Sequence, residues 1–303
     1  AGSGPGGDCG GDCGGGGAEL PRCEVLVLGP GGRSTAFSQA SRAPKAVVTV
    51  EPLLSHKECA YIVEAAEAAA AAKAACGGQG LVGDSSDGGW STSRHYAVPT
   101  TDLPVHAIPS LVPLFRRLMD SKVAPLLARH FGGQATAQAG GPLQGFDSPG
   151  HVRVHDAFVV RYRAGRQALL PLHADESALS LTLPLNPHSD FAGGGTYFGA
   201  LRRAVSPAVG HGVLFEGRAL HGGEPIAGAG ATRYVLAAFF YLDTTAGATA
   251  GEGSGQGGAR ARADREPWDE EEEGTLFKRQ KFLEANRQSD TGSARASFSF
   301  GFF

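Results

Sequence analysis

The spacing of apolar residues changes near the middle of the chain. Before that point, two stretches have the apolar spacing of helices. The first follows Ser55 and Glu58, whose separation is typical of a capping box, and ends at a pair of glycines (77–78). The second is predicted to begin at Ser110 and to be interrupted at Pro125, because proline removes a helical hydrogen bond. Both are expected to pack outside the rest of the domain.

Strand-like patterns lie on both sides of these helices. Short apolar runs occur between residues 23 and 54, and again between 151 and 243. In the second region Gly, Pro and Asn separate the runs at intervals of roughly 10 to 15 residues, a spacing close to that of sandwiches and barrels. The chain is therefore predicted to be mainly β with flanking α-helices.

The two ends of the chain differ from this middle part. The head is dominated by glycine, and the C-terminal end combines Gly, Ala and Ser with an acidic run at 269–273 and one segment with a helical pattern at 276–287. Such segments cannot bury enough apolar area to offset the entropy of ordering them. We therefore expect a disordered head (1–22), one domain (23–243) and a low-complexity tail (244–303).

Composition and charge narrow the function classes only slightly. The net charge of -3 gives no general attraction to nucleic acid, so no nucleic-acid partner is expected. No apolar run reaches the roughly 18 to 20 residues of a membrane-spanning helix, so no membrane span is expected. The five cysteines lack a disulfide-framework spacing, and Cys9 with Cys13 alone is a weak metal motif. Because the first residue is Ala and not Met, the sequence predicts neither compartment nor leader, and it predicts no oligomeric state.

One polar pair stands between the apolar runs of the predicted barrel. In "LPLHADES", His173 and Asp175 separate a leucine-rich run from the alternating "ALSLTLPL". Residues i and i+2 of an extended strand point to the same side, so the imidazole and the carboxylate can converge on one point. Divalent first-row metals accept both a neutral nitrogen and a charged oxygen. The pair therefore predicts part of a metal site.

A third ligand and a cation follow downstream. His221 lies 46 residues after Asp175, which leaves room for two or three strands and for a meeting across a rolled-up sheet. Two histidines and one carboxylate form the triad typical of non-haem Fe(II) oxygenases. Arg233 lies 12 residues further on, at the start of an apolar strand, and is the only Lys or Arg from 219 to 243. A buried arginine needs an anion, which a dicarboxylate co-substrate would supply.

With their surroundings, these residues resemble a known family, the 2-oxoglutarate- and Fe(II)-dependent dioxygenases. The prolyl 4-hydroxylase and procollagen lysyl hydroxylase branch is the most similar. The likeness covers residues 46–243, because "VVTVEPLLSHKECAYIVEAAE" is similar to the leading strand and helix of that branch. The catalytic part of the resemblance is carried by "RYRAGRQALLPLHADESALSLTLPLN", "FAGGGTYF", "VGHGVLFEGRALHGGEPI" and "TRYVLAAFFYLD".

The resemblance implies a role for each candidate residue. His173, Asp175 and His221 would bind Fe(II), and Arg233 would bind the C5 carboxylate of the co-substrate 2-oxoglutarate. Tyr162, in "VVRYRAG", would lie near the same co-substrate. The reaction would consume O2, hydroxylate a C–H bond and release succinate and CO2, with ascorbate as a further requirement.

The resemblance also implies a fold and a substrate class. The core, over about 151–243, would be a double-stranded β-helix (jelly-roll, cupin-like) with iron inside the mouth of the barrel. The substrate would be a prolyl side chain, or else a lysyl side chain, of a peptide or protein. Two alternatives remain open: the same chemistry on a small molecule or nucleic-acid base, and a non-catalytic cupin-like binding module.

The spacing between the distal histidine and the basic residue departs from the family. The family's basic residue usually follows the distal histidine by about 9 to 10 positions, whereas Arg233 follows His221 by 12, with "AGAGA" between them. A longer glycine turn would absorb the difference.

Trp90 and Arg94 are expected in a structural loop, with a place at the substrate mouth as the alternative. Four further histidines of the β region are not expected to bind metal: His151, His155, His188 and His211.

Overall fold

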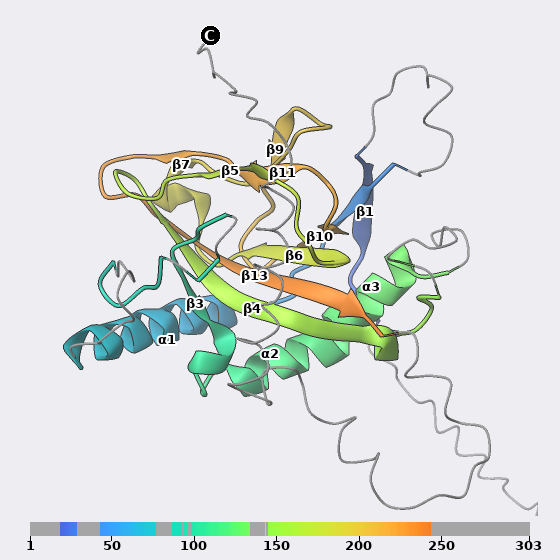
Figure 1. Cartoon of the computed structure of the whole chain (residues 1–303), viewed down its shortest axis with the longest axis horizontal. Coiled ribbons are helices and arrows are strands. Elements are labelled where there is room, and N and C mark those ends of the chain that lie inside the picture. The colour runs from blue at the N-terminus through green and yellow to red at the C-terminus, as the bar shows by residue number, and fades with distance from the viewer. Residues whose placement is uncertain are drawn as a thin grey trace, which may run out of the picture.

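A computed structural model describes residues 19–28, 43–76, 87–92, 94–95, 98–133, 143 and 145–243 of the chain. The predicted tail (244–303) and nearly all of the predicted head (1–22) lie outside these residues, as does the Cys9–Cys13 motif. The described part contains two antiparallel sheets and a small two-stranded pair, with helices at one side (Figure 1). The prediction of a mainly β chain with flanking helices is confirmed.

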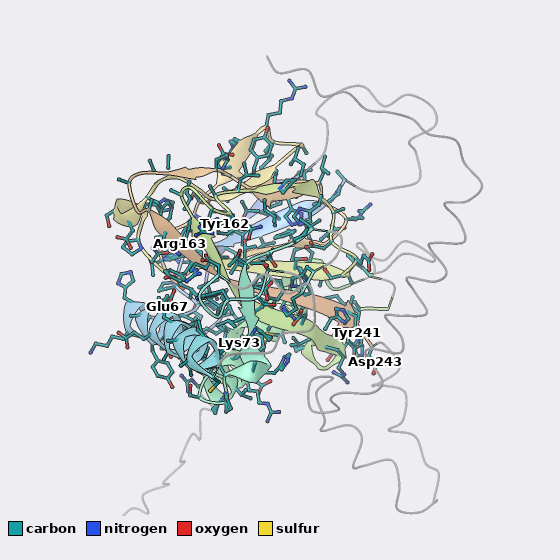
Figure 2. All side chains as sticks on the ribbon, turned by 60° about the vertical axis from the view of Figure 1, so that its left-hand side comes forward. Glu67, Lys73, Tyr162, Arg163, Tyr241 and Asp243 are labelled. Carbon is teal, nitrogen blue, oxygen red and sulfur yellow. The ribbon has the colours of Figure 1, made fainter. Side chains whose placement is uncertain are left out.

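The larger sheet has seven strands in the order β1-β2-β10-β6-β13-β4-β3. Its two longest strands, β4 and β13, pair along their whole length, and Tyr162 and Tyr241 lie near opposite ends of this pair (Figure 2). The strands are β1 (Cys23–Val27), β2 (Lys45–Thr49), β3 (Asp102–Pro104), β4 (Val152–Arg163), β6 (Leu179–Pro184), β10 (Val213–Glu216) and β13 (Thr232–Leu242).

The smaller sheet has four strands in the order β5-β11-β8-β9 and faces the larger one. The Thr182 and Thr196 hydroxyls, 2.9 Å apart, connect the two sheets. The strands are β5 (Leu170–His173), β8 (Thr196–Phe198), β9 (Arg203–Val205) and β11 (His221–Gly223), and the separate pair is β7 (Ala192–Gly193) with β12 (Ile226–Ala227).

The order of the strands between the sheets identifies the core. Leaving aside β7 and β12, the chain passes from the large sheet to the small one and back as it runs from β4 to β13, with only β8 and β9 consecutive in the small sheet. Two antiparallel sheets connected in this alternating way form a jelly roll. The predicted double-stranded β-helix fold is therefore confirmed.

The first helix follows its sequence signals. Helix α1 (His56–Ala75) begins at Ser55, whose hydroxyl accepts from the Glu58 N–H while the Glu58 carboxylate accepts from the Ser55 N–H. This is the predicted capping box, which satisfies two backbone donors at the helix start. Helix α1 ends at Cys76, directly before the glycine pair.

The second helical region differs from its prediction. Helix α2 (Val112–Leu118) begins two residues after Ser110, and Pro125 does not interrupt the helix. A π-helical turn, η2 (Met119–Val123), leads directly into α3 (Ala124–Phe131), and Pro125 lies in the first turn of α3. Proline is tolerated in a first turn, and the wider π turn changes the hydrogen-bond pattern just before it. Short 3-10 turns complete the elements: η1 (Val105–Ala107), η3 (Pro149–His151) and η4 (His188–Asp190).

The two faces of the large sheet have different neighbours. Alternate residues of its strands, such as Leu181, Leu214 and Leu236, form one apolar cluster with the helices, which lie along this face (Figure 1). The residues between them face the smaller sheet, so they line the interior of the jelly roll. None of the helices in the described part of the chain is long and apolar enough to span a bilayer.

Candidate metal centre and co-substrate pocket

Strand pairing in the small sheet brings two histidines together. His173 is the last residue of β5 and His221 is the first residue of β11, and these two residues are direct partners in the ladder. The sequence placed His221 across the barrel with two or three strands intervening. That arrangement is wrong: five short strands, β6 to β10, intervene, and the histidines meet as neighbours within one sheet. Jelly-roll connections make this possible because strands distant in sequence become adjacent.

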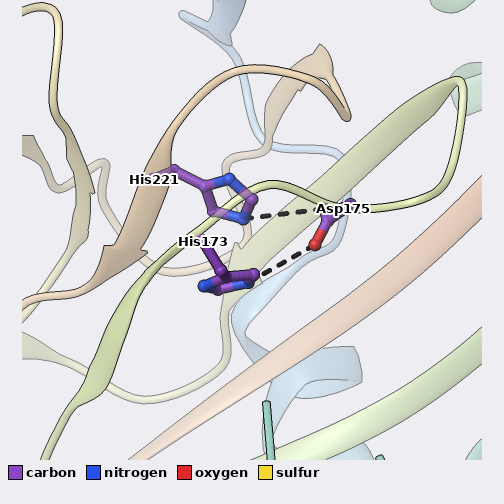
Figure 3. Close-up of side chains that lie close together, drawn as sticks. All are labelled: His173, Asp175 and His221. Atoms are coloured by element: carbon purple, nitrogen blue, oxygen red, sulfur yellow. Dashed lines mark ion pairs between the residues drawn. The ribbon is translucent and has the colours of Figure 1, made fainter. Parts of the chain in front are cut away.

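Asp175 reaches the same point from just beyond the strand. Strand β5 ends at His173, so Asp175 lies two residues beyond the paired part of the strand. The Asp175 N–H donates to the Gly217 carbonyl 2.8 Å away. This bond holds the carboxylate beside the two imidazoles, with an ion pair to each (Figure 3).

The three side chains offer a compact set of donor atoms. One Asp175 oxygen lies 3.4 Å from His173 Nε2 and the other lies 3.5 Å from His221 Nε2. One donor atom from each residue lies within 4.8 Å of the other two, and the imidazole centroids are 4.4 Å apart. Among the residues that the structure describes, no other group of three such side chains converges in this way.

Backbone carbonyls determine which imidazole nitrogen is available. His173 Nδ1 lies 2.8 Å from the Pro171 carbonyl, and His221 Nδ1 lies 2.8 Å from the Ala219 carbonyl. A carbonyl oxygen can only accept, so each Nδ1 carries the proton and each Nε2 keeps its lone pair. Metal-binding histidines are typically held by such a bond from the other ring nitrogen. The sequence did not reveal these acceptors, because a backbone carbonyl carries no residue signature.

The surroundings favour a neutral His221 beside a charged Asp175. Burial lowers the pKa of His221 below its ordinary value. Burial also opposes ionisation of Asp175, but its contacts with His173, His221 and Ser180 outweigh that effect and leave its pKa lowered. The pKa of His173 is raised, since its bond with Asp175 outweighs burial. The Phe215 ring packs against His221, with centroids 4.5 Å apart, and gives the site an apolar wall.

Arg233 and Tyr162 lie on the same interior face of the large sheet. They are direct partners in the β13–β4 ladder, and the guanidinium carbon lies 5.1 Å from the centre of the Tyr162 ring. Burial lowers the pKa of Arg233 and raises that of Tyr162. Among the described residues, no carboxylate forms an ion pair with Arg233. A buried cation without an anion fits the predicted role as a co-substrate anchor.

Glycines make room for this pair, and one of them lies on β11, the strand that carries His221. A side chain at Gly194 would meet Arg233 Cδ at 3.2 Å, and the φ angle of 78° at this residue also favours glycine. A side chain at Gly223, two residues after His221, would meet the Tyr162 hydroxyl at 3.0 Å. Two motifs that were quoted for the resemblance, "FAGGGTYF" and "LHGGEPI", therefore allow close packing around Arg233 and Tyr162.

The longer spacing before Arg233 is absorbed in a turn. Gly228 and Gly230 adopt positive φ angles of 125° and 70° between β12 and β13. Strand β13 then begins at Thr232, and Arg233 faces the interior. The two extra residues therefore do not change the face on which the arginine lies.

The loop with Trp90 and Arg94 is held by structural contacts. Trp90 is fully buried under the Arg161 guanidinium, 4.6 Å from its ring centre. Arg94 forms ion pairs with Asp102 at 2.6 Å and Asp156 at 2.9 Å. These contacts favour the structural interpretation of the loop. The four other histidines, His151, His155, His188 and His211, are not part of the converging group of His173, Asp175 and His221.

One contact at the site had no counterpart in the sequence analysis. The Ser180 hydroxyl donates to the Asp175 carboxylate at 2.5 Å. The available signal was the alternation in "ALSLTLPL", where Ser180 and Thr182 occupy every second position between leucines. That pattern was interpreted only as a scaffold, yet one of its polar positions, Ser180, contacts Asp175, while Thr182 bonds Thr196.

Comparisons with known proteins agree with the predicted resemblance. No family model matches the chain. The chain is 38% identical over 86 residues to the mouse (Mus musculus) protein "2-oxoglutarate and iron-dependent oxygenase domain-containing protein 2". The matched region is 25% of this chain and 24% of the mouse protein. It is also 30% identical over 165 residues to the rat (Rattus norvegicus) protein "Multifunctional procollagen lysine hydroxylase and glycosyltransferase LH3". The matched region is 50% of this chain and 20% of the rat protein.

These relatives are considerably longer than the matched region, since the chain spans about a quarter of their length or less. Among solved structures, a viral collagen prolyl hydroxylase from Paramecium Bursaria Chlorella virus-1 is 16% identical, with 68% of this chain and 98% of that chain covered and a TM-score of 0.35. A TM-score this low does not define the fold. The assignment of a jelly roll depends on the strand order instead. The resemblance to the 2-oxoglutarate- and iron-dependent oxygenases, lysyl hydroxylases included, is confirmed by the curated relatives.

Proposed function

We propose that this chain, a relative of the 2-oxoglutarate- and iron-dependent oxygenases, is itself an Fe(II)- and 2-oxoglutarate-dependent dioxygenase. The observation that carries the proposal is the convergence of His173, Asp175 and His221 in a jelly roll. A non-catalytic binding module would not require this donor set together with a buried Arg233 that has no acidic partner among the described residues. The enzyme would use 2-oxoglutarate and O2 to hydroxylate a C–H bond, with release of succinate and CO2.

The residues present fit Fe(II). Two imidazole Nε2 atoms with free lone pairs and one charged carboxylate are a ligand set suited to this metal, and three protein ligands leave positions open for other molecules. His173, Asp175 and His221 would hold the ion. Bound Fe(II) would supply the redox chemistry that couples O2 to oxidation of 2-oxoglutarate and of the substrate.

The remaining interior residues would bind and orient the co-substrate. Arg233 would form a bidentate pair with the distal carboxylate of 2-oxoglutarate, because a guanidinium presents two parallel N–H donors to a carboxylate. Tyr162 lies against the guanidinium and limits its movement. Burial of both side chains strengthens the ion pair and keeps water away from it.

The substrate proposal is a prolyl or lysyl side chain of a peptide or protein. It is supported by the lysine hydroxylase among the curated relatives and by the similarity of the sequence to the prolyl and lysyl hydroxylase branch. Ascorbate would maintain the metal in its reduced state, as expected for that branch. A peptide substrate is the partner that this proposal requires.

The test uses the purified chain with Fe(II), ascorbate, 2-oxoglutarate and libraries of proline- and lysine-containing peptides. Succinate release and a gain of one oxygen in a peptide, detected by mass spectrometry, are expected together. Both should be lost in His173→Ala and Asp175→Ala, and both should persist in His188→Ala, since His188 contacts Ser206 outside the metal-binding cluster. Failure to bind metal together with no turnover of any peptide would contradict the proposal.

A further inference from the structure

Ser180 is a hydroxyl residue in an otherwise apolar part of the large sheet. It lies on the central strand β6, and its ladder partners are Phe215 on β10 and Phe239 on β13. The residue is 1% exposed. A buried hydroxyl costs free energy unless it is hydrogen-bonded, and the two partners of Ser180 are the Asp175 carboxylate and the Ser177 hydroxyl.

The direction of the hydrogen bonds follows from the number of available protons. The ionised Asp175 carboxylate only accepts, so the single Ser180 proton must be donated to it across 2.5 Å. The Ser180 and Ser177 oxygens are 2.9 Å apart, and Ser180 has no further proton to give. Ser177 is therefore the donor, and a relay runs from Ser177 through Ser180 to Asp175. Such chains polarise each member and strengthen the last bond.

The backbone holds the start of this relay in place. Gly217, at the end of β10, accepts from the Asp175 N–H at 2.8 Å and donates to the Ala178 carbonyl at 3.1 Å. A side chain at Gly217 would meet the Ser177 carbonyl at 2.0 Å, so this close approach requires glycine. These two backbone hydrogen bonds to Gly217 hold the segment between His173 and β6, which carries Asp175 and Ser177, in a fixed position.

We propose that Ser180, supported by Ser177, is a positioning residue that holds the Asp175 carboxylate in its metal-binding orientation. The inference rests on the proposed metal-dependent function. The bond to one carboxylate oxygen restricts rotation of the carboxylate, so both oxygens stay turned toward the imidazole nitrogens. Without the relay, the carboxylate would lose its rotational freedom only when the metal binds. That loss of entropy would weaken the metal affinity.

The experiment measures metal affinity rather than activity. Mn(II) is titrated into the purified chain and binding is followed by electron paramagnetic resonance. Ser180→Ala is expected to weaken the affinity roughly 10- to 100-fold, the usual effect of removing a partner of a metal ligand. Ser180→Thr keeps the hydroxyl and should restore most of the affinity. Thr182→Val is the matched control, because this hydroxyl, two residues along the same strand face, bonds Thr196 instead of Asp175.

A spectroscopic readout separates positioning from general damage to the fold. The visible absorption bands of bound Co(II) should change in saturated Ser180→Ala and stay unchanged in Thr182→Val. If Ser180→Ala does not fold, Ser177→Ala carries the test, with a smaller loss of affinity expected. Native affinity and native Co(II) bands in a folded Ser180→Ala or Ser177→Ala variant would overturn the inference. Absence of metal binding by the unaltered chain would instead overturn the proposed function.

Discussion

Two buried arginines on neighbouring strands of the large sheet face opposite sides of it. Arg161 on β4 is 7% exposed and faces the helices, whereas Arg233 on β13 is 5% exposed and faces the jelly-roll interior. Arg161 forms ion pairs with Glu67 of α1 at 3.3 Å and with Asp87 at 2.8 Å. Among the described residues, Arg233 has no acidic partner at all.

This difference separates a structural charge from a binding charge. Each arginine has a tyrosine as its neighbour: Tyr234 pairs with Arg161 in the ladder and Tyr162 pairs with Arg233. On the helix side, the Tyr234 hydroxyl completes the network by donating to Glu67 at 2.5 Å. On the interior side, no carboxylate among the described residues supplies the anion. The missing ion pair, rather than burial alone, is what singles out Arg233 as a candidate binding residue.

The largest effect on stability is expected from Arg161→Met. This change leaves the Glu67 carboxylate without its cation, leaves Asp87 with only Arg163 at 3.5 Å, and removes the contact with Trp90. We expect the free energy of unfolding to fall by roughly 2 to 3 kcal/mol, less than for a fully buried pair, because Glu67 reaches solvent. Urea denaturation measures the loss. The 2-oxoglutarate concentration for half-maximal succinate release should stay near its original value in the folded enzyme.

Arg233→Met, the same substitution at the second arginine, should preserve stability and raise the 2-oxoglutarate requirement. In Arg233→Met no carboxylate of the described chain loses an ion pair, and an uncompensated buried charge is removed, so stability should be unchanged or higher. The loss of a charged hydrogen-bonded pair with the co-substrate, about 1.5 to 3 kcal/mol, should raise the half-maximal 2-oxoglutarate concentration roughly 10- to 100-fold. Mn(II) affinity without 2-oxoglutarate is the control and should not change. An equal loss of metal affinity and stability would mean that Arg233 is structural.

The smallest effect is expected for Tyr234→Phe and depends on pH. Burial and the bond to Glu67 raise the pKa of Tyr234 in the folded chain. Its contribution to stability is therefore complete below the unfolded pKa of about 10 and is lost as the pH rises above it. Removing the hydroxyl should cost about 1 kcal/mol at neutral pH and make the decline of stability at alkaline pH less steep. Thermal unfolding between neutral and alkaline pH measures both, and an unchanged slope would contradict this assignment.

Local patterns were sufficient for much of the fold. The capping box of Ser55 and Glu58 marked the start of α1 correctly, because both contacts lie within one helical turn. The alternating runs from 151 to 243 indicated the jelly roll, since strand periodicity and turn residues are local properties. The interruption predicted at Pro125 is wrong, because the π turn before it depends on packing that one residue does not reveal.

The candidate site was predictable in its members but not in its geometry. The types and order of His173, Asp175 and His221 are visible in the chain, whereas their meeting point depends on the pairing of β5 with β11. Ser180 escaped notice because a serine between leucines is an ordinary strand residue until its partner is known.

The sequence by itself determined which chemical groups the protein has and which local elements carry them, because side-chain chemistry and periodicity are written along the chain. It contained the two imidazoles, the carboxylate and two arginines in apolar strands. Only the tertiary structure decided that Arg161 faces acids on a helix and a loop while Arg233 faces none in the part of the chain that the structure describes. The physical reason is that alternate residues of a strand face different environments, and strand pairing determines what occupies each of them.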